Sequence, residues 1–174
     1  MKTILVDIDG TIADCSHRLT AATRASGSID WNKYFEPSRA FDDLPNHVAT
    51  RVLGELHSRN YNIIYVSGRR KSMETVTRAW LDRAGFPPGE LHLRETGRTF
   101  EFKIMKFREL SFQHEIALSI GNGWEEMEAA RILSIPHIRV PTFGDEHERN
   151  TSLPPLKIGL VESWSIILDA NTKA

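Results

Sequence analysis

The chain has 174 residues, of which 40% are hydrophobic and 26% charged, and its formal net charge is −1 at pH 7. This composition is typical of a globular protein, and the balanced charge excludes a molecule-wide field that would attract nucleic acid or a membrane surface. The single cysteine, Cys15, excludes an intramolecular disulfide framework, and no apolar run is long enough for a signal-peptide core or a membrane span. We therefore expect a cytoplasmic protein.

Predicted strands and helices alternate along most of the chain. In chain order, the apolar residues predict a strand at residues 3–8, a helix at 46–59, a strand at 62–66, a helix at 72–84, a strand at 91–93, a helix at 102–110, a strand at 115–120, a helix at 124–133 and a strand at 137–140. Ser72 is expected to cap the second helix, and Gly85 follows its end. This alternation predicts an α/β fold with a doubly wound (Rossmann-like), mostly parallel sheet.

Two segments do not fit this alternation. Residues 16–44 are polar with aromatic residues interspersed, and they form a longer stretch than a simple loop needs. We expect a small cap-like insertion over the end of the first strand, the alternative being a surface excursion with no role in binding. A C-terminal extension starts at about residue 145, and residues 152–164 are expected to form one further edge element, because Pro154 and Pro155 cannot lie in a central strand. With both additions, residues 1–174 are expected to form a single domain.

Asp7 and Asp9 follow the apolar residues of the first predicted strand. A buried carboxylate is costly unless a partner compensates its charge. In an open parallel sheet, ligands bind beyond the carboxyl ends of the strands, and the two-residue repeat of a strand would point both side chains to the same side. Gly10 then allows a tight exit from the strand. Two carboxylates in this place suit either a divalent cation or a nucleophile with a proton donor.

The second predicted strand ends in the sequence YVSGRRK. Ser67 offers a hydroxyl group, and Gly68 and Arg69 offer backbone N–H groups at a strand-to-helix turn, which is a common cradle for phosphate oxygens. Arg70 and Lys71 add positive charge. The alternative is an ordinary turn with a solvated basic cluster.

Two later motifs also fall next to predicted element ends. Lys103 stands near the start of the helix at 102–110, where a positive charge is unfavourable unless an anion lies close by; a surface lysine is the alternative. After the strand at 115–120, Asn122 supplies a side-chain oxygen, and Glu125 and Glu126 lie in the first turn of a helix. Acidic residues there also stabilise helix starts, which is the alternative for Glu125 in particular.

Together, these four motifs resemble those of the haloacid dehalogenase-like (HAD) phosphohydrolase superfamily. That superfamily pairs a DxDGT motif with a Ser or Thr after the second strand, a downstream Lys and a later acidic loop. The resemblance covers residues 2–140, and the DIDGT and SGR sequences carry it most specifically. Within the superfamily, the segments DIDGTIADCSHRL and VSGRRKSMETVTRAWL, together with Asp30 and Trp31, are similar to the phosphatase domains of phage-type polynucleotide kinases.

This resemblance implies a catalytic pair. Asp7 would be the nucleophile that forms an aspartyl-phosphate, and Asp9 would protonate the leaving oxygen and then deprotonate the attacking water. Lys103 would neutralise the charge of Asp7 and the phosphoryl group. Lys106 is the alternative to Lys103, because it lies one helical turn further on.

The resemblance also implies a phosphate-binding group and a Mg²⁺ site. Ser67, Gly68 and Arg69 would hold the phosphoryl oxygens, and Thr11, which shapes the turn near Asp9, is assigned to the same group. The ligands of Mg²⁺ would be the Asp7 carboxylate, the main-chain carbonyl of Asp9 and a side chain of the fourth motif. The phosphate-binding residues are thus Ser67, Gly68, Arg69 and Thr11, and the metal-binding residues are Asp7, Asp9, Asn122 and Glu126.

The fourth motif departs from the superfamily, which usually carries Asp where this chain has Asn122 and Glu126. Asn122 keeps an oxygen ligand but lacks the charge that favours Mg²⁺. Glu126 keeps a charge on a longer arm, which would contact metal-bound water or Lys103. Two functions are therefore open: a Mg²⁺-dependent phosphomonoester hydrolase, or a catalytically weak HAD-like module that binds a phosphorylated ligand or a partner protein.

The short insertion would leave the site open to a large substrate. The expected substrates are a phosphorylated small molecule, such as a nucleotide, or a nucleic-acid end. His17, Arg18 and Trp31 are candidates for the entrance. The alternatives are that His17 is a surface residue and that Trp31 packs within the insertion.

Overall fold

The computed structural model of the chain describes residues 1–144 and 159–170. Its strands are β1 (Lys2–Val6), β2 (Ala13–Asp14), β3 (Leu44–Pro45), β4 (Asn62–Arg70), β5 (Glu90–Arg94), β6 (Glu115–Gly121) and β7 (His137–Arg139). Its α-helices are α1 (Ser16–Ala22), α2 (Trp31–Tyr34), α3 (Pro37–Ala40), α4 (His47–Ser58), α5 (Glu74–Arg83), α6 (Thr99–Gln113), α7 (Trp124–Ile132) and α8 (Leu160–Ala170), and a short 3₁₀ helix, η1 (Lys71–Met73), precedes α5.

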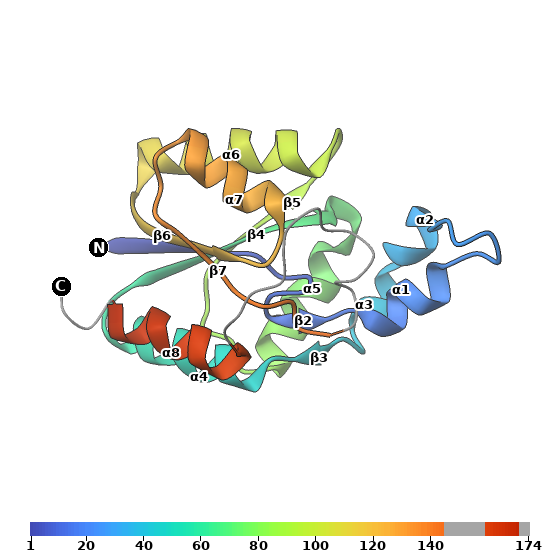
Figure 1. Ribbon diagram of the computed structural model, residues 1–174, viewed down its shortest axis with the longest axis horizontal. Helices are drawn as coiled ribbons and strands as arrows, with labels where there is room; N and C mark the ends of the chain where they lie inside the picture. Colours follow the sequence, from blue (N-terminus) through green and yellow to red (C-terminus); the bar gives the residue numbers. More distant parts are fainter. Residues whose placement is uncertain (145–158, 171–174) are drawn as a thin grey trace.

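Five strands form one parallel sheet in the order β5-β4-β1-β6-β7. Helices α6 and α7 cover one face of this sheet, and α4, α5 and α8 cover the other (Figure 1). The central strand β1 is apolar because it is buried on both faces: Leu5 packs on the side of α6 and α7, whereas Ile4 and Val6 belong to the core on the other side. The predicted doubly wound α/β fold is confirmed.

Several element ends differ from the sequence prediction. Strand β4 continues through Arg70, four residues past the predicted end. The second predicted helix begins as η1, and α5 starts at Glu74, so Ser72 is not its N-cap. Helix α6 starts at Thr99, which places Lys103 one turn inside the helix rather than at its start. The periodicity of apolar side chains does not locate element ends to the residue, because the ends are set by the hydrogen bonds of single residues.

Residues 16–44 contain α1, α2 and α3, and the pairing of β2 with β3 closes this insertion at its base. Figure 1 shows α1 and α2 beyond the carboxyl ends of the parallel strands. The Asp30 side chain accepts hydrogen bonds from two backbone N–H groups and caps α2. Trp31, Tyr34 and Phe35 pack against one another, with ring centroids 4.9–6.0 Å apart. The insertion therefore has aromatic packing of its own next to the sheet edge where ligands bind.

The C-terminal part differs from the prediction where it can be compared. Residues 152–158 of the predicted edge element lie outside the described residues, but the remainder is mostly helical, in α8. Trp164 and Ile167 are fully buried and join the core cluster that also contains the buried residues of α4. Their spacing of three residues suits a helix and not a strand. Within residues 1–144 and 159–170, no helix combines the length and apolarity that a membrane crossing requires.

Candidate active site

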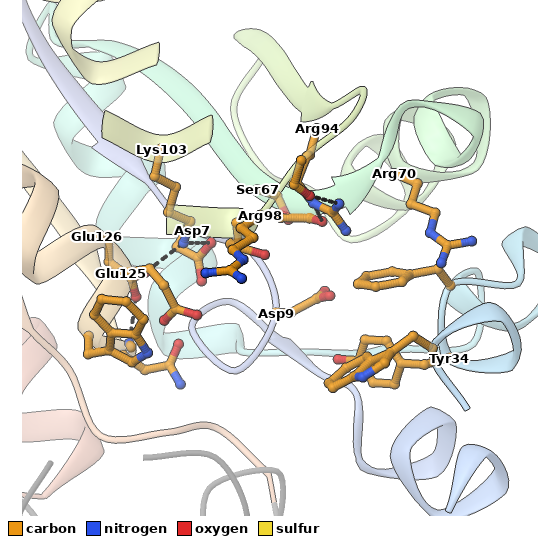
Figure 2. Close-up of a pocket in the computed structure, with 18 residues that line it drawn as sticks. Asp7, Asp9, Tyr34, Ser67, Arg70, Arg94, Arg98, Lys103, Glu125 and Glu126 are labelled. Carbon is orange, nitrogen blue, oxygen red and sulfur yellow. Dashed lines mark hydrogen bonds and ion pairs between the residues drawn. The ribbon is translucent and has the colours of Figure 1, made fainter. Parts of the chain in front are cut away.

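Asp7, Lys103 and Glu126 form a buried chain of charges at the carboxyl end of β1. Lys103 Nζ donates to Asp7 Oδ1 at 2.7 Å and to Glu126 Oε2 at 2.6 Å (Figure 2). Burial and the nearby charge of Glu126 raise the pKa of Asp7 to about 7, against the opposing effect of Lys103. Burial alone would lower the pKa of Lys103, but the charges of Asp7 and Glu126 raise it, so the lysine stays charged.

The geometry favours Lys103 over Lys106 as the lysine that acts on Asp7. Lys106 Nζ instead pairs with the exposed Glu109 at 2.6 Å. Lys106 also lines a different cavity, which lies between β5 and α6. A role for Lys106 at Asp7 would therefore require a different arrangement of α6.

Glu126 is engaged through both of its carboxylate oxygens. Oε2 accepts from Lys103, and Oε1 accepts from the Gly123 N–H at 2.5 Å. Glu126 is only 2% exposed. This arrangement matches the alternative in which Glu126 contacts Lys103, and we infer that Glu126 orients the lysine instead of offering an oxygen to a metal ion.

Thr11 joins the first motif to the fourth. Its hydroxyl oxygen lies 2.9 Å from Asn122 Oδ1 and 3.3 Å from Asp7 Oδ2, and it accepts a hydrogen bond from the Asn122 N–H at 3.1 Å. Gly10 permits this approach, because its φ is +74° and a Cβ atom there would lie 2.7 Å from Asn122 Nδ2. Thr11 is fully buried and outside the pocket lining, so the structure places it as a support for Asp7 and Asn122 and not against a bound phosphate.

Asp9 is held by two buried arginines. Its Oδ1 accepts from Arg69 Nε at 2.7 Å and from Arg18 Nη2 at 2.9 Å, and the Cys15 thiol lies 3.2 Å away. Burial alone would raise the pKa of Asp9, but the two guanidinium charges hold it well below its usual range. Asp7 and Asp9 line the same pocket, as the two-residue repeat predicts, but they have separate partners.

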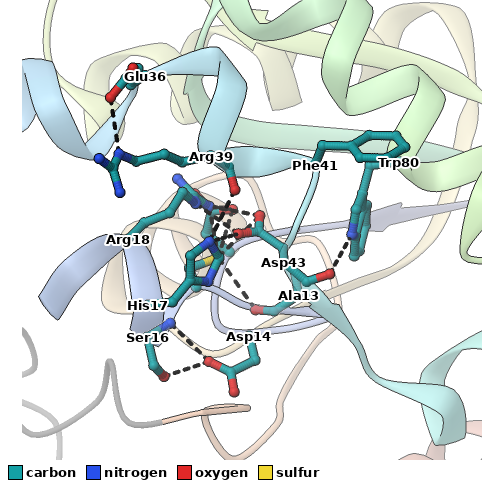
Figure 3. A network of polar contacts seen from close by, with 12 residues as sticks. Ala13, Asp14, Ser16, His17, Arg18, Glu36, Arg39, Phe41, Asp43 and Trp80 are labelled. Carbon is teal, nitrogen blue, oxygen red and sulfur yellow. Dashed lines mark hydrogen bonds and ion pairs between the residues drawn. The ribbon is translucent and has the colours of Figure 1, made fainter. Parts of the chain in front are cut away.

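Asp43 completes this arginine network (Figure 3). It accepts from Arg18 Nε at 2.8 Å and from Arg69 Nη2 at 2.5 Å, and its main-chain carbonyl accepts from Trp80 Nε1. Both guanidinium groups are therefore buried between the carboxylates of Asp9 and Asp43. Acidic and thiol groups of Asp9, Cys15 and Asp43 lie close enough together to bind a metal ion, but the guanidinium groups already supply the positive charge there.

These contacts bear on two assignments made from the sequence. Arg69 was expected to offer its backbone N–H to a phosphate; in the structure this N–H donates to Ser67 Oγ at 3.2 Å, and the Arg69 side chain is fully buried in the network. Arg18 was a candidate for the entrance, yet it is fully buried as well. His17 is a surface residue whose Nε2 contacts the Arg39 carbonyl at 3.0 Å, whereas Trp31 lines the pocket. In both arginines, the guanidinium group is buried because buried carboxylates compensate its charge.

The pocket above Asp7 has a volume of about 590 Å³. Ser67 and Gly68 line it at the end of β4. Gly68 allows the start of α6 to approach the backbone of β4, since a Cβ atom at residue 68 would lie 2.7 Å from Thr99 Cγ2. Gly68 is partly exposed in the pocket lining, whereas Ser67 is only 1% exposed.

Several pocket residues were not identified from the sequence, namely Tyr34, Phe35, Arg94, Arg98, Trp124 and the pocket-facing side of Arg70. Arg94 follows from the same rule as Asp7 and Ser67, because it ends the next parallel strand, β5. Glu125 also lines the pocket, and burial raises the pKa of its carboxyl group. It forms no ion pair with any described residue, unlike Glu126.

Comparisons with known proteins agree with this fold. The family model of the HAD superfamily, subfamily IIIB (acid phosphatase), matches residues 1–150. No curated protein matches the chain. Among solved structures, the class C acid phosphatase from Bacillus anthracis is 22% identical, with a TM-score of 0.59 over 97% of this chain and 78% of that one. The D,D-heptose 1,7-bisphosphate phosphatase from B. bronchiseptica is 10% identical, with a TM-score of 0.60 over 98% and 99% of the two chains.

A third similar structure comes from the Pnkp1/Rnl/Hen1 complex. It is 20% identical to this chain, with a TM-score of 0.64 over 83% of this chain, and the chain spans 46% of the length of its counterpart there. The parallel sheet, the charges at the end of β1 and the family match over residues 1–150 lead to one assignment. The chain belongs to subfamily IIIB (acid phosphatase) of the HAD superfamily.

Proposed function

We propose that this protein is a phosphatase, a Mg²⁺-dependent phosphomonoester hydrolase that acts through an aspartyl-phosphate on Asp7, with nucleotides or nucleic-acid ends as substrates. The observation that best supports the proposal is the ion pair of Asp7 with Lys103 at the base of a pocket whose lining includes Ser67 and Gly68. Lys103 holds Oδ1 of Asp7, and Oδ2 has only the long contact with Thr11. Oδ2 is therefore the oxygen available for attack on phosphorus.

In the first step, Asp7 attacks phosphorus and the bond from phosphorus to the leaving oxygen breaks. Ser67 and the Gly68 N–H hold the phosphoryl oxygens, and Lys103 stabilises their negative charge. Asp9 delivers a proton to the leaving oxygen. In the second step, a water molecule attacks the aspartyl-phosphate, Asp9 accepts its proton, and inorganic phosphate leaves with Asp7 restored.

The arginines around Asp9 affect the choice of a test substrate. They fix the carboxyl group in place through Oδ1, which leaves Oδ2 for proton transfer. They also lower the pKa of Asp9, so protonated Asp9 is scarce near neutral pH. An aryl phosphate, whose leaving group depends least on a proton donor, is therefore the appropriate probe.

The donor atoms at the site suit Mg²⁺, which prefers oxygen ligands. The Asp7 carboxylate, the Asp9 main-chain carbonyl and the Asn122 amide oxygen would hold the ion. Asn122 Nδ2 donates to Thr142 Oγ1 at 3.0 Å, which fixes the orientation of the amide. Glu125 adds a further carboxylate to the same pocket. When bound, Mg²⁺ would supply positive charge that lets the substrate phosphate approach Asp7.

Aromatic residues on two sides of the pocket support a nucleotide substrate. Trp31 stacks on Phe35 with their ring centroids 6.0 Å apart, and the ring centroids of Trp124 and Phe100 are 5.1 Å apart. Trp31 is 44% exposed and Trp124 is 36% exposed, so each keeps a free ring surface. Nucleobases of any sequence stack on such rings. The proposal of nucleic-acid ends also draws on the likeness to a chain of the Pnkp1/Rnl/Hen1 RNA repair complex.

Removal of metal tests the proposed cofactor. Hydrolysis of an aryl phosphate is expected to fall at least about 100-fold when a chelator replaces Mg²⁺ and to return when Mg²⁺ is added back. The measurement is the steady-state rate in the two buffers at one pH. Equal rates would contradict Mg²⁺ dependence. A wild-type protein that hydrolyses neither aryl phosphates nor nucleoside monophosphates in Mg²⁺ would favour the catalytically weak binding module.

The variant Asn122→Asp tests the metal ligand of the fourth motif. A carboxylate at this position adds a negative charge to the site, so we expect Mg²⁺ to bind about tenfold more tightly. Titration calorimetry with Mg²⁺ alone measures this affinity without turnover. Asn60→Asp is the matched control, because Asn60 is exposed in the turn before β4, at the opposite end of that strand from the site. Unchanged affinity in Asn122→Asp would assign the ligand to another residue, with Glu125 the next candidate.

A further inference from the structure

Three arginines line the pocket beyond the Asp7 and Lys103 pair. Arg70 ends β4, Arg94 ends β5 and Arg98 precedes α6. None of the three forms an ion pair with a described residue, whereas Lys103 pairs with two carboxylates. The pocket lining has as many carboxylates as basic side chains, but no described carboxylate pairs with Arg70 or Arg94.

Arg70 and Arg94 face the same aromatic ring. Their guanidinium carbons lie 5.2 Å and 5.6 Å from the ring centroid of Phe35. Burial lowers the pKa of Arg94, and the neighbouring charge of Arg70 lowers it further. Hydrogen bonds from Arg94 to the carbonyls of Gly68 (3.2 Å) and Gly97 (2.6 Å) hold it in place despite this repulsion. An anion between the two guanidinium groups would remove the repulsion and accept hydrogen bonds from both.

The position of Arg70 separates it from the reacting phosphate. In the view of Figure 2, Lys103, Asp7 and Glu126 lie at one end of the pocket, Arg70 and Tyr34 lie toward the other, and Asp9 lies between. All of them line one cavity of about 590 Å³, which is within the usual size range for a small-molecule site. A single ligand can therefore place one anionic group at Asp7 and a second at the arginines.

We propose that Arg70 and Arg94 bind a second phosphate of the substrate. The preferred substrates are then nucleotides that carry another phosphate besides the one removed. Trp31, stacked on Phe35, offers a ring surface for the base next to this arginine group. The second phosphate belongs either to a nucleoside bisphosphate or to the phosphodiester next to a phosphorylated nucleic-acid end. This inference rests on the proposed function and narrows its substrate class.

Substrate preference tests the inference. We expect wild-type kcat/KM to be at least about tenfold higher for a nucleoside bisphosphate, or for a dinucleotide with a terminal phosphomonoester, than for a nucleoside monophosphate. The more strongly preferred of the two identifies the source of the second phosphate. Arg70→Gln is expected to remove most of this preference through a higher KM, and Arg70→Lys to keep part of it. Arg51→Gln, on the exposed side of α4, is the matched control and should keep all of it.

Binding without turnover separates this inference from the proposed function. An Asp7→Asn protein is titrated with a nucleoside bisphosphate, with tryptophan fluorescence as the signal, and the titration is repeated after adding Arg70→Gln. We expect the dissociation constant to rise about tenfold or more. Weaker binding in the double variant, together with no hydrolysis by the wild type, would support the arginine site and reject the proposed function. Active wild-type protein without a preference for a second phosphate, or equal binding by both titrated proteins, would overturn the inference.

Discussion

Replacing Asp7 by asparagine is expected to lower kcat for an aryl phosphate by about four orders of magnitude or more, because an amide cannot attack phosphorus. The fold is expected to survive the change. The amide oxygen can still accept a hydrogen bond from Lys103, which keeps its charged partner Glu126. Burial already raises the pKa of Asp7 to about 7, so its negative charge contributes little to the stability of the folded protein.

The comparison requires two measurements on each protein. Initial rates in Mg²⁺ give the loss of activity, and thermal unfolding shows whether the variant is folded. Asp42→Asn, an equal change at an exposed aspartate, is the matched control and should keep both properties. An Asp7→Asn protein that is folded and retains activity within about tenfold of the wild type would exclude Asp7 as the nucleophile.

Replacing Asp43 by asparagine is expected to lower the free energy of unfolding by about 3–5 kcal/mol. Arg18 and Arg69 are fully buried, and in this variant they would face only the carboxylate of Asp9. Removing one partner from a buried set of charges leaves an uncompensated charge in a medium that solvates it poorly. The lost stability would affect the base of the insertion, because Asp43 joins this base to β4 through Arg69.

Denaturant unfolding of the two proteins measures this effect. The control is Glu36→Gln, which breaks an exposed ion pair with Arg39 and should change stability by less than about 1 kcal/mol. Similar small changes in both variants would show that the buried network does not stabilise the insertion. The main-chain bond from Trp80 to Asp43 is present in either case, because it does not involve the side chain.

The parts of the site that follow β1 could be predicted from local sequence. Apolar residues before Asp7 predict a central strand, and the carboxyl end of such a strand is where ligands bind. Gly10 predicts a turn, and the structure shows that Gly10 allows Asn122 to approach; Gly68, which lies within β4, allows the approach of Thr99. These features depend on neighbours in the chain or on the edge of the sheet, and both can be inferred without long-range contacts.

The roles of the arginines could not be predicted in this way. Arg69 and Arg70 are adjacent on β4, and successive side chains of a strand point to opposite sides. Arg69 therefore enters the buried network, whereas Arg70 faces the pocket. Sequence alone cannot say which of the two turns inward, because the deciding partner, Asp43, comes from the insertion.

The roles of the two lysines of α6 could not be predicted from the sequence either. Lys103 and Lys106 are three residues apart, and helical periodicity alone leaves both near one face. Lys103 reaches Asp7 and Glu126, which come to α6 from the end of β1 and from the first turn of α7. The sequence by itself determined the α/β fold, the nucleophile candidate and the edge of the sheet that carries the site, because these depend on local patterns of burial and turn. Only the tertiary structure decided which charged side chains share that site, since a buried charge is placed by partners that are distant in the chain.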